Sequence, residues 1–280
     1  IMRNLKNESK SILFISHKLN EIMAISDRCT ILRKGKYIGT VNIKDNNKEE
    51  LSSMMVGRDV KFAVDKTPAK PGKTVLKVQD LVVKSKLHKK NAVDGVSIHV
   101  NAGEIVCIAG IDGNGQTEFV HALTGLDKIE SGEVIFMDED ITKKSIHYKN
   151  THGFSHIPED RHKHGLILDF TLEQNMVLQR YFESEFQNNG FSRFKEVREY
   201  AQKLIDEYDV RSGQGPVTSA RSMSGGNQQE AIWAREMDGE HDVLMAVQPA
   251  RGLDVGAIEA METKRVKKRD EGDGILLVSL

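Results

Sequence analysis

Cysteine is scarce in this chain, whose 280 residues include only Cys29 and Cys107. The two lie far apart, in or beside apolar runs, and form neither a zinc-ligand nor a disulfide spacing. We expect both to be buried thiols in a reducing cytosol. Net charge is also nearly absent, at −1. Without a basic excess, the sequence offers no footprint for nucleic acid, so none is expected as a partner.

Long apolar runs are missing as well. No stretch approaches the roughly 18 residues that a membrane helix needs. The apolar part of the basic N-terminal stretch is too short for a signal peptide. The sequence starts at Ile1 rather than at a methionine, from which we expect a fragment. Its length suits one full domain plus a piece of another.

A glycine loop between a strand and a helix is the first feature that carries chemistry. The apolar run Ile105–Ala109 predicts a buried strand, and a helical pattern follows the glycines. Gly110-x4-Gly115-Gln116-Thr117 fits the phosphate-loop template except at the lysine. We expect the backbone N–H groups from Gly113 to Thr117 to bind phosphates, and the Thr117 hydroxyl to ligate magnesium. Gln116 carries no positive charge, so we expect weaker nucleotide binding; a plain strand-turn-helix is the alternative.

A second glycine motif opens a helix, in the stretch RSMSGGNQQ from Arg221 to Gln229. The following residues contain no helix breaker and have apolar residues at helical spacing. Bare backbone N–H groups at a helix N-terminus attract anions, and the helix dipole adds to this. A serine N-cap after a glycine turn is the structural alternative.

These segments resemble the ATP-binding domains of ABC transporters, and RSMSGGNQQ is similar to their LSGGQ signature. The resemblance implies an α/β fold of the P-loop NTPase type, with a parallel core sheet, an antiparallel β-subdomain and a helical subdomain that carries the signature. It implies ATP and Mg²⁺ as cofactors, with the signature contacting the γ-phosphate of an ATP held by the opposite domain. The implied cofactor-binding residues are Gly110, Gly113, Asn114, Gly115, Gln116, Thr117, Ser224, Gly225, Gly226, Asn227, Gln228 and Asp254, with Thr117 also the metal ligand.

Several catalytic positions of the family carry other residues here. Where the family has Asp and Glu at the end of a strand, this chain has Val247 and Gln248. Glu159 stands where a glutamine usually faces the metal. A glutamine orients water but accepts no proton, and a valine ligates nothing. The resemblance therefore implies a degenerate site, in which Gln248 and Glu159 keep the catalytic positions. Asp254 lies in GLDVG, which resembles the D-loop where two nucleotide domains touch.

A weak internal repeat suggests that the altered catalytic positions belong to one copy of a duplicated domain. ILFISH at Ile12–His17 is similar to ILLVSL at Ile275–Leu280, 263 residues later. One ABC domain plus linker has about that length, so we expect a piece of a tandem duplication. His17 then matches the switch histidine that senses γ-phosphate, and Leu280 takes its place in the second copy. The signature of this chain would complete the active site of the first domain.

The expected organisation has three parts. Residues 1–66 are the C-terminal tail of a first nucleotide-binding domain, 67–74 are a linker, and 75–280 are a second domain truncated at its C-terminus. We expect strands at Ile12–Ser16, Cys29–Arg33, Tyr37–Val41 and Val243–Val247, helices at 18–26 and 48–56, and a helical segment from Asp169 to Asp209. Ile12–Ser16 either fills a vacant place in the second-domain sheet or hangs loosely beside it.

The resemblance is closest to the two-domain ATPase subunit of bacterial importers for simple sugars and nucleosides. It implies ATP hydrolysis by the full protein on the cytoplasmic face of the membrane, with little activity in this chain alone. The implied partners are the first domain or a second copy, permease subunits and, indirectly, a substrate receptor. The alternatives are a nucleotide-binding module without turnover and a soluble ABC protein outside transport. The five histidines from His147 to His164 leave a metal site open, and only His88 lies near the place of an adenine-stacking aromatic.

Overall fold

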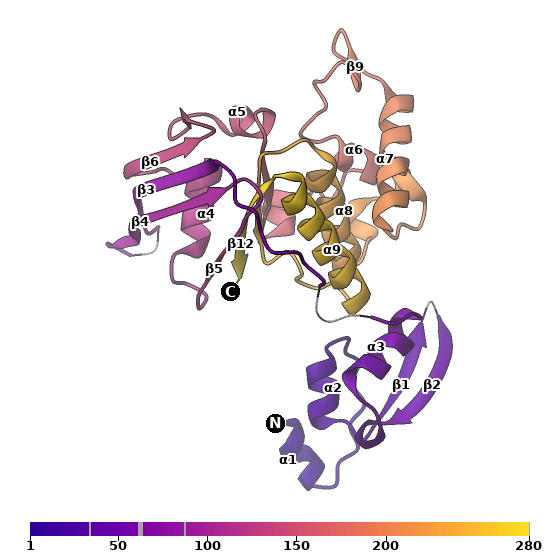
Figure 1. Ribbon diagram of the computed structural model, residues 1–280. Coiled ribbons are helices and arrows are strands. Elements are labelled where there is room, and N and C mark those ends of the chain that lie inside the picture. Colours follow the sequence, from indigo (N-terminus) through magenta and orange to yellow (C-terminus); the bar gives the residue numbers. More distant parts are fainter. Residues whose placement is uncertain (34, 61–63, 87, 280) are drawn as a thin grey trace. The chain divides into compact units, whose positions relative to one another are not determined.

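The computed structural model describes residues 1–33, 35–60, 64–86 and 88–279 (Figure 1). The chain folds into two compact units. The first comprises Ile1–Lys66 with Leu253–Lys264, and the second comprises Thr67–Gly252 with Arg265–Leu280. Each unit has a hydrophobic core of its own. Within the described ranges, no helix combines the length and the hydrophobicity needed to cross a bilayer.

In the first unit, short helices accompany a two-stranded antiparallel sheet. Its elements are α1 (Met2–Asn7), α2 (Leu19–Ile25), β1 (Arg28–Arg33), β2 (Lys36–Asn42), η1 (Ile43–Asp45) and α3 (Lys48–Val56). Helix α3 begins with a capping box, in which Asn47 and Glu50 each bond the other's backbone N–H. The expected helices and the strands after residue 28 are confirmed. Their apolar faces form a core of Leu19, Ile22, Ile31, Ile43 and Leu51.

The expected strand at Ile12–Ser16 is wrong. These residues carry no regular secondary structure, and Leu13 and Ile15 are 96% and 99% exposed. A strand needs neighbours for its backbone groups, and among the described residues Ile12–Ser16 pairs with none. The idea that it fills a vacant place in the second sheet is wrong as well, because Gly274–Ser279 occupies that place.

The second unit is built on a four-stranded parallel sheet. Its strand order is β5 (Ile105–Ala109), β12 (Gly274–Ser279), β11 (Val243–Val247) and β8 (Phe154–Ile157). Strand β12 pairs with β5 on one side and with β11 on the other. All five residues of β11 are buried, as expected for a central parallel strand. The predicted strands at Ile105–Ala109 and Val243–Val247 are confirmed, but Ile105–Ala109, which was expected to be buried, has no buried residue, and Cys107 and Ala109 are exposed.

An antiparallel sheet shares a core with the parallel sheet. Its order is β4 (Asn91–Asn101), β3 (Thr74–Lys84), β6 (Ser131–Phe136) and β7 (Glu139–Asp140). Helix α4 (Gln116–Thr124) buries Phe119, Val120 and Leu123 in this core. A short helix, α5 (Ile146–Thr151), leads into β8. Parallel and antiparallel sheets with these helices form the α/β fold of the P-loop NTPase type that the sequence predicts.

The helical part of the second unit surrounds a second apolar cluster. It contains α6 (Leu172–Met176), α7 (Phe194–Tyr208), α8 (Gly225–Asp238) and the short turns η3 (Gly215–Val217) and η4 (Ala220–Ser222). The expectation that residues 169–209 are helical holds only in part. A hairpin of β9 (Gln187–Asn188) and β10 (Phe191–Ser192) interrupts them, because Asn189 and Gly190 have the positive φ of a tight turn. Helix α9 (Val255–Glu271) precedes β12.

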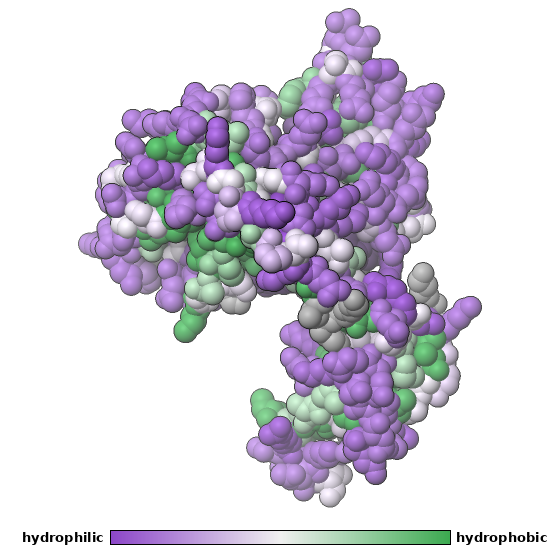
Figure 2. Space-filling view, in the orientation of Figure 1, coloured by the Kyte–Doolittle hydropathy of each residue, from purple (hydrophilic) through white to green (hydrophobic). Residues whose placement is uncertain are grey.

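Strand β5 is the edge of the parallel sheet, which corrects the expectation for Cys107. That thiol is exposed, whereas Cys29 is partly buried. An edge strand has a neighbour on one side only, so part of its surface remains open to solvent. Figure 2 shows apolar surface gathered around the region of β4, β5 and α4, on a face that is otherwise mostly hydrophilic.

Leu204 tests the packing of the helical part. Its side chain is fully buried in the apolar cluster between α6, α7 and α8. We expect Leu204→Ala to lower the free energy of unfolding by about 2–5 kcal/mol, since it removes buried methyl groups and leaves a cavity. Phe194→Ala on the same helix, at a side chain 69% exposed, should cost under about 1 kcal/mol. Equal costs in urea denaturation would contradict this packing.

Candidate nucleotide-binding site

The loop from Gly110 to Gly115 connects β5 to α4, as a phosphate loop requires. Gly113 and Gly115 have φ values of +86° and +96°, a conformation that glycine adopts without strain. A Cβ on Gly115 would lie 2.1 Å from the Ala92 carbonyl oxygen, whereas one on Gly113 would meet open space. Gly113 and Asn114 are exposed. The loop therefore presents accessible backbone at the N-terminus of α4, where an anion is stabilised.

Gln116 turns back into the loop. Its Nε2 donates a hydrogen bond to the Ile111 carbonyl at 3.2 Å and lies against Gly110, whose added Cβ would be 2.1 Å away. The side chain is 8% exposed, and its Oε1 has no hydrogen-bond partner in the described part of the chain. The position of the missing lysine is thus occupied by a neutral amide that stabilises the loop and brings no charge to a phosphate.

Thr117 and Glu159 meet beside the loop. The Thr117 hydroxyl donates to Glu159 Oε2 at 3.1 Å, and Arg251 Nη1 lies 4.0 Å from Glu159 Oε1. Magnesium is usually bound by one or two carboxylates together with waters and phosphate oxygens. One hydroxyl and one carboxylate fit a magnesium ion that also binds nucleotide phosphates. They do not form a complete metal site by themselves.

The two positions at which the resemblance implies an acid and a base lie at the end of β11. Val247 is 2% exposed and belongs to the core, so it offers no ligand. Gln248 is half-buried, with its N–H donating to the Val278 carbonyl at 2.9 Å. Its φ of +43° is uncommon for a residue with a side chain, and such conformations cluster at functional sites. The structure places a neutral amide where a general base is expected.

The second glycine motif forms the tip of α8. Ser224 is exposed and caps the helix, since its hydroxyl accepts from the Asn227 N–H at 3.3 Å. The N-cap interpretation is therefore confirmed, and it leaves Gly225 and Gly226 as the first helical residues. A Cβ on Gly226 would lie 3.0 Å from the Gly252 carbonyl oxygen. The absence of side chains at Gly225 and Gly226 thus allows Arg161 and Gly252 to approach this helix end closely, while Ser224 remains exposed.

Two polar side chains of the motif serve the fold. Asn227 Nδ2 donates to the Arg211 carbonyl at 2.9 Å. Gln228 is 4% exposed, donates to the Ala220 carbonyl at 2.9 Å and contacts His162 Nε2 at 2.9 Å. These bonds fix the start of α8 against the preceding turn and against the loop that follows β8. What the tip offers a ligand is the Ser224 hydroxyl and backbone N–H groups.

Two expected site residues belong to the first unit. His17 is exposed there, just before α2. Asp254 precedes α9, and its Oδ1 accepts from the Ala257 N–H at 2.9 Å, as a helix cap does. Leu280, which the sequence repeat predicts as the counterpart of His17, lies outside the described residues. His88 is exposed and precedes β4.

The histidines between residues 147 and 164 do not form a metal centre. Among the residues that the structure describes, no group of three or more His, Cys, Asp or Glu side chains is arranged to hold a metal ion. His162 bonds Gln228, and the His164 ring contacts the edge of His121 with centroids 5.2 Å apart. His156 is enclosed in β8; burial, reinforced by His121, His164 and Arg235, lowers its pKa to about 3.

A cavity of about 410 Å³ connects these groups. It is lined by Thr117, His121, Glu159, Asp160, Arg161, His162, Lys163, His164 and Arg251. The residues from Arg161 to Gly165 form a single π-helical turn, η2, capped by the Asp160 carboxylate. Thr117 and Glu159 were predicted as site residues from the sequence, whereas Arg161 and Arg251 were not. Both lie in stretches that resemble family motifs, HIPEDRHKHG and QPARGLDVG, but at positions for which the resemblance implies no role. Only the fold brings them together.

The two loop glycines form a matched pair for mutation. Gly115→Ala makes a methyl group clash with the Ala92 carbonyl oxygen. We therefore expect it to lower the free energy of unfolding by well over the roughly 1–2 kcal/mol that a left-handed backbone conformation costs by itself. Gly113 also has a positive φ, but a Cβ added there meets open space. Gly113→Ala should therefore lower the free energy of unfolding only by the cost of the left-handed conformation. Chemical denaturation of both variants measures the difference. Equal losses would mean that the close approach at Ala92 is absent.

His156 predicts how stability depends on pH. Its pKa is about 3 in the folded chain and about 6.5 in an unfolded one, so the unfolded state binds the proton first as pH falls. The contribution of neutral His156 to the free energy of unfolding is complete above pH 6.5. It is lost as the pH falls toward 3, by at most about 1.4 kcal/mol per pH unit. His156→Gln should flatten the slope of unfolding free energy between pH 6.5 and 4.5. An unchanged slope would show that His156 is protonated in the folded chain.

Comparisons with known proteins identify the family and the fold of this chain. Residues 93–250 match the family model for the ABC transporter. The chain is 46% identical to the nucleoside import ATP-binding protein NupA of Lactococcus lactis subsp. cremoris and 47% identical to the guanosine import ATP-binding protein NupO of Bacillus subtilis. Both alignments include all of this chain but only 55% and 54% of those proteins, so the chain spans about half their length.

Solved structures show the same fold. A nucleotide-free ATP-binding cassette from an ABC transporter aligns with a TM-score of 0.58 at 20% identity, covering 74% of this chain and 81% of that one. A dimeric bacterial ABC transporter cassette aligns with a TM-score of 0.62 at 19% identity, covering 73% and 87%. With the family model spanning more than half of its residues, this chain belongs to the ABC transporter family of ATP-binding proteins.

Proposed function

We propose that this chain is part of the ATP-hydrolysing subunit of an ABC importer for nucleosides or simple sugars. Its residues 75–280 act as the second nucleotide-binding domain, 67–74 as the linker and 1–66 as the tail of the first domain. The nucleoside and guanosine importers NupA and NupO are the relatives that support this substrate class. The observation that carries the proposal is an accessible signature tip beside a pocket without its charged catalytic groups.

The chain's own pocket is degenerate in this proposal. Gln116 brings no charge to the phosphates, Val247 is buried in the core, and Gln248 accepts no proton from water. ATP hydrolysis depends on positioning the phosphates and stabilising the charge that develops on them. With these groups replaced, the pocket binds the nucleotide and Mg²⁺ through the loop backbone, Thr117 and Glu159, and turns it over slowly.

The signature tip serves the other pocket. Ser224, Gly225 and Gly226 keep what a γ-phosphate needs, namely a hydroxyl and backbone N–H groups at the positive end of a 14-residue helix. The first domain supplies its own phosphate loop and, through His17, the group that senses the γ-phosphate. Asp254 lies at the contact between the two domains. The pocket of the first domain is then the active site, and the chain's own pocket is the slow one.

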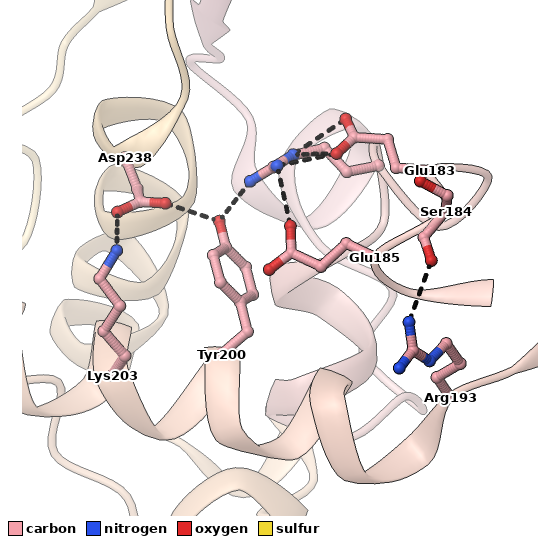
Figure 3. A network of polar contacts seen from close by, with 8 residues as sticks. Glu183, Ser184, Glu185, Arg193, Tyr200, Lys203 and Asp238 are labelled. Carbon is pink, nitrogen blue, oxygen red and sulfur yellow. Dashed lines mark hydrogen bonds and ion pairs between the residues drawn. The ribbon is translucent and has the colours of Figure 1, made fainter.

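A groove in the second unit suits the permease. A cavity of about 1070 Å³ is bounded by α7, the C-terminal end of α8 and the starts of β8 and β11. Eight carboxylates and four lysine or arginine side chains line it. Figure 3 shows part of its wall, with Lys203 and Tyr200 both directed at Asp238 at 3.0 Å. Burial raises the pKa of the Tyr200 hydroxyl, so it remains a hydrogen-bond donor. An acidic groove suits a basic segment of a membrane subunit.

Two alternatives remain outside this proposal. A nucleotide-binding module without turnover fits the chain alone, given its altered pocket. An ABC protein outside transport fits less well, because the relatives at 46% and 47% identity carry import in their names. In the importer, the subunit works at the cytoplasmic face of the membrane, and a receptor delivers the substrate to the permease.

Phosphate release separates these functions. The chain alone should release phosphate slowly from ATP, and the protein with its first domain restored should release it rapidly. Rapid release by the chain alone, abolished by Gln248→Ala, would contradict the degenerate pocket. Absence of release from the restored protein, with ATP bound, would favour the module without turnover.

Ser224→Arg tests the signature. In the restored protein we expect turnover to stop, because the side chain fills the space that the γ-phosphate needs, while ATP binding at the first domain's loop survives. Ser192→Arg makes the same change on the exposed β9–β10 hairpin and should leave turnover unchanged. Full turnover by Ser224→Arg would remove the signature from the mechanism.

A further inference from the structure

The cavity beside Thr117 carries an excess of positive charge. Its lining contains Arg161, Lys163 and Arg251 against the carboxylates of Glu159 and Asp160. Its volume of about 410 Å³ lies within the range of small-ligand sites, which begins near 300 Å³. Since the cavity includes the hydroxyl that follows the phosphate loop, an anion held by that loop extends toward these cations.

Arg161 has no counter-ion among the residues that the structure describes. Over the described ranges, its guanidinium forms neither an ion pair nor a side-chain hydrogen bond, and its Nε is buried without a partner. The group lies against the start of α8, where a Cβ on Gly225 would be 2.5 Å from its Nη2. A cation at the positive end of a helix is repelled by the helix dipole. The arrangement is therefore electrostatically incomplete without an anion.

The two carboxylates of the cavity are already engaged. Asp160 accepts the backbone N–H groups of His162 and Lys163 at 3.0 and 3.1 Å. Glu159 accepts the Thr117 hydroxyl at 3.1 Å and lies 4.0 Å from Arg251. Lys163 is exposed and, like Arg161, has no ion pair within the described residues. Two cations are thus left free for a ligand.

We propose that this cavity binds the terminal phosphates of the nucleotide, with Arg161 as its main cation and Lys163 and Arg251 at its rim. These groups replace the charge that Gln116 lacks. Guanidinium groups suit phosphates because they donate two parallel hydrogen bonds in a fixed geometry. The inference rests on the proposed function, since it concerns the chain's own nucleotide pocket, and it assigns that pocket a different source of positive charge.

Calorimetric titration of the full chain with sodium tripolyphosphate isolates the phosphate contacts from those to the base. We expect Arg161→Gln to weaken binding by about tenfold or more, as the loss of a charged hydrogen bond predicts. Arg161→Lys, which keeps the charge but loses the planar group, should lie between that variant and the native chain. Gln116→Lys in the Arg161→Gln background should restore affinity, because it returns a cation to the loop.

Lys195→Gln is the matched control. Its side chain is 82% exposed on α7, so the same loss of charge there should leave binding within about twofold. The melting temperature of Arg161→Gln should match that of the native chain, since Arg161 forms no ion pair with any residue that the structure describes. ATP titrations of the same variants should follow the same order of affinities.

Three results would overturn the inference. They are an undetectable affinity of the native chain for tripolyphosphate at millimolar concentration, an unchanged affinity in Arg161→Gln, and an equal loss in Lys195→Gln. The proposed function fails separately, through the response of turnover to Ser224→Arg. If Ser224→Arg abolishes turnover of the restored protein but Arg161→Gln leaves the affinity for tripolyphosphate unchanged, the proposed importer function stands and only the phosphate site at Arg161 is rejected.

Discussion

The pairing of β12 between β5 and β11 is the constraint on which the site depends. In a parallel sheet, the carboxyl ends of neighbouring strands meet at one edge. The register of β5, β12, β11 and β8 therefore brings the loop at Gly110, the residue pair Val247–Gln248 and the segment with Glu159 to a common edge. The hydrogen bond from Thr117 to Glu159, which joins positions 42 residues apart, follows from this arrangement.

Strong local patterns in the sequence predicted much of the fold, and non-local partners decided the rest. Val243–Val247 is recognisable because a run of apolar residues bounded by polar ones suits a strand buried on both faces. Ile12–Ser16 has the same composition, yet composition does not supply the neighbouring strands that hold such a run. The β9–β10 hairpin was missed because charged, helix-favouring residues surround its Asn-Gly turn, whose geometry is set at Asn189 and Gly190.

The candidate site divides in the same way. The phosphate loop follows a template of fixed spacing, so its glycines and Thr117 were found from sequence. The structure explains why glycine is needed at Gly115, where the Ala92 carbonyl leaves no room for a side chain. The resemblance implies no role for Arg161 and Arg251, which are 90 positions apart. Only tertiary structure places both beside Thr117, and only their contacts show that Arg161 lacks a counter-ion in the described part of the chain.

The altered residues of the pocket are also consistent with one another. An ionised side chain buried without a partner is costly, so a carboxylate at position 247, which is 2% exposed, needs a nearby cation. In the proposed degenerate pocket, the neutral side chains of Gln116 and Val247 avoid both charges, and Val247 packs in the apolar core. The tip of α8 is independent of that balance, because its ligand groups are a hydroxyl and backbone N–H groups. Ala231, Ile232 and Ala234 hold the helix in place through apolar packing. In the proposed importer, a domain built this way would lack catalytic charges of its own while keeping the helix tip that it offers to another site.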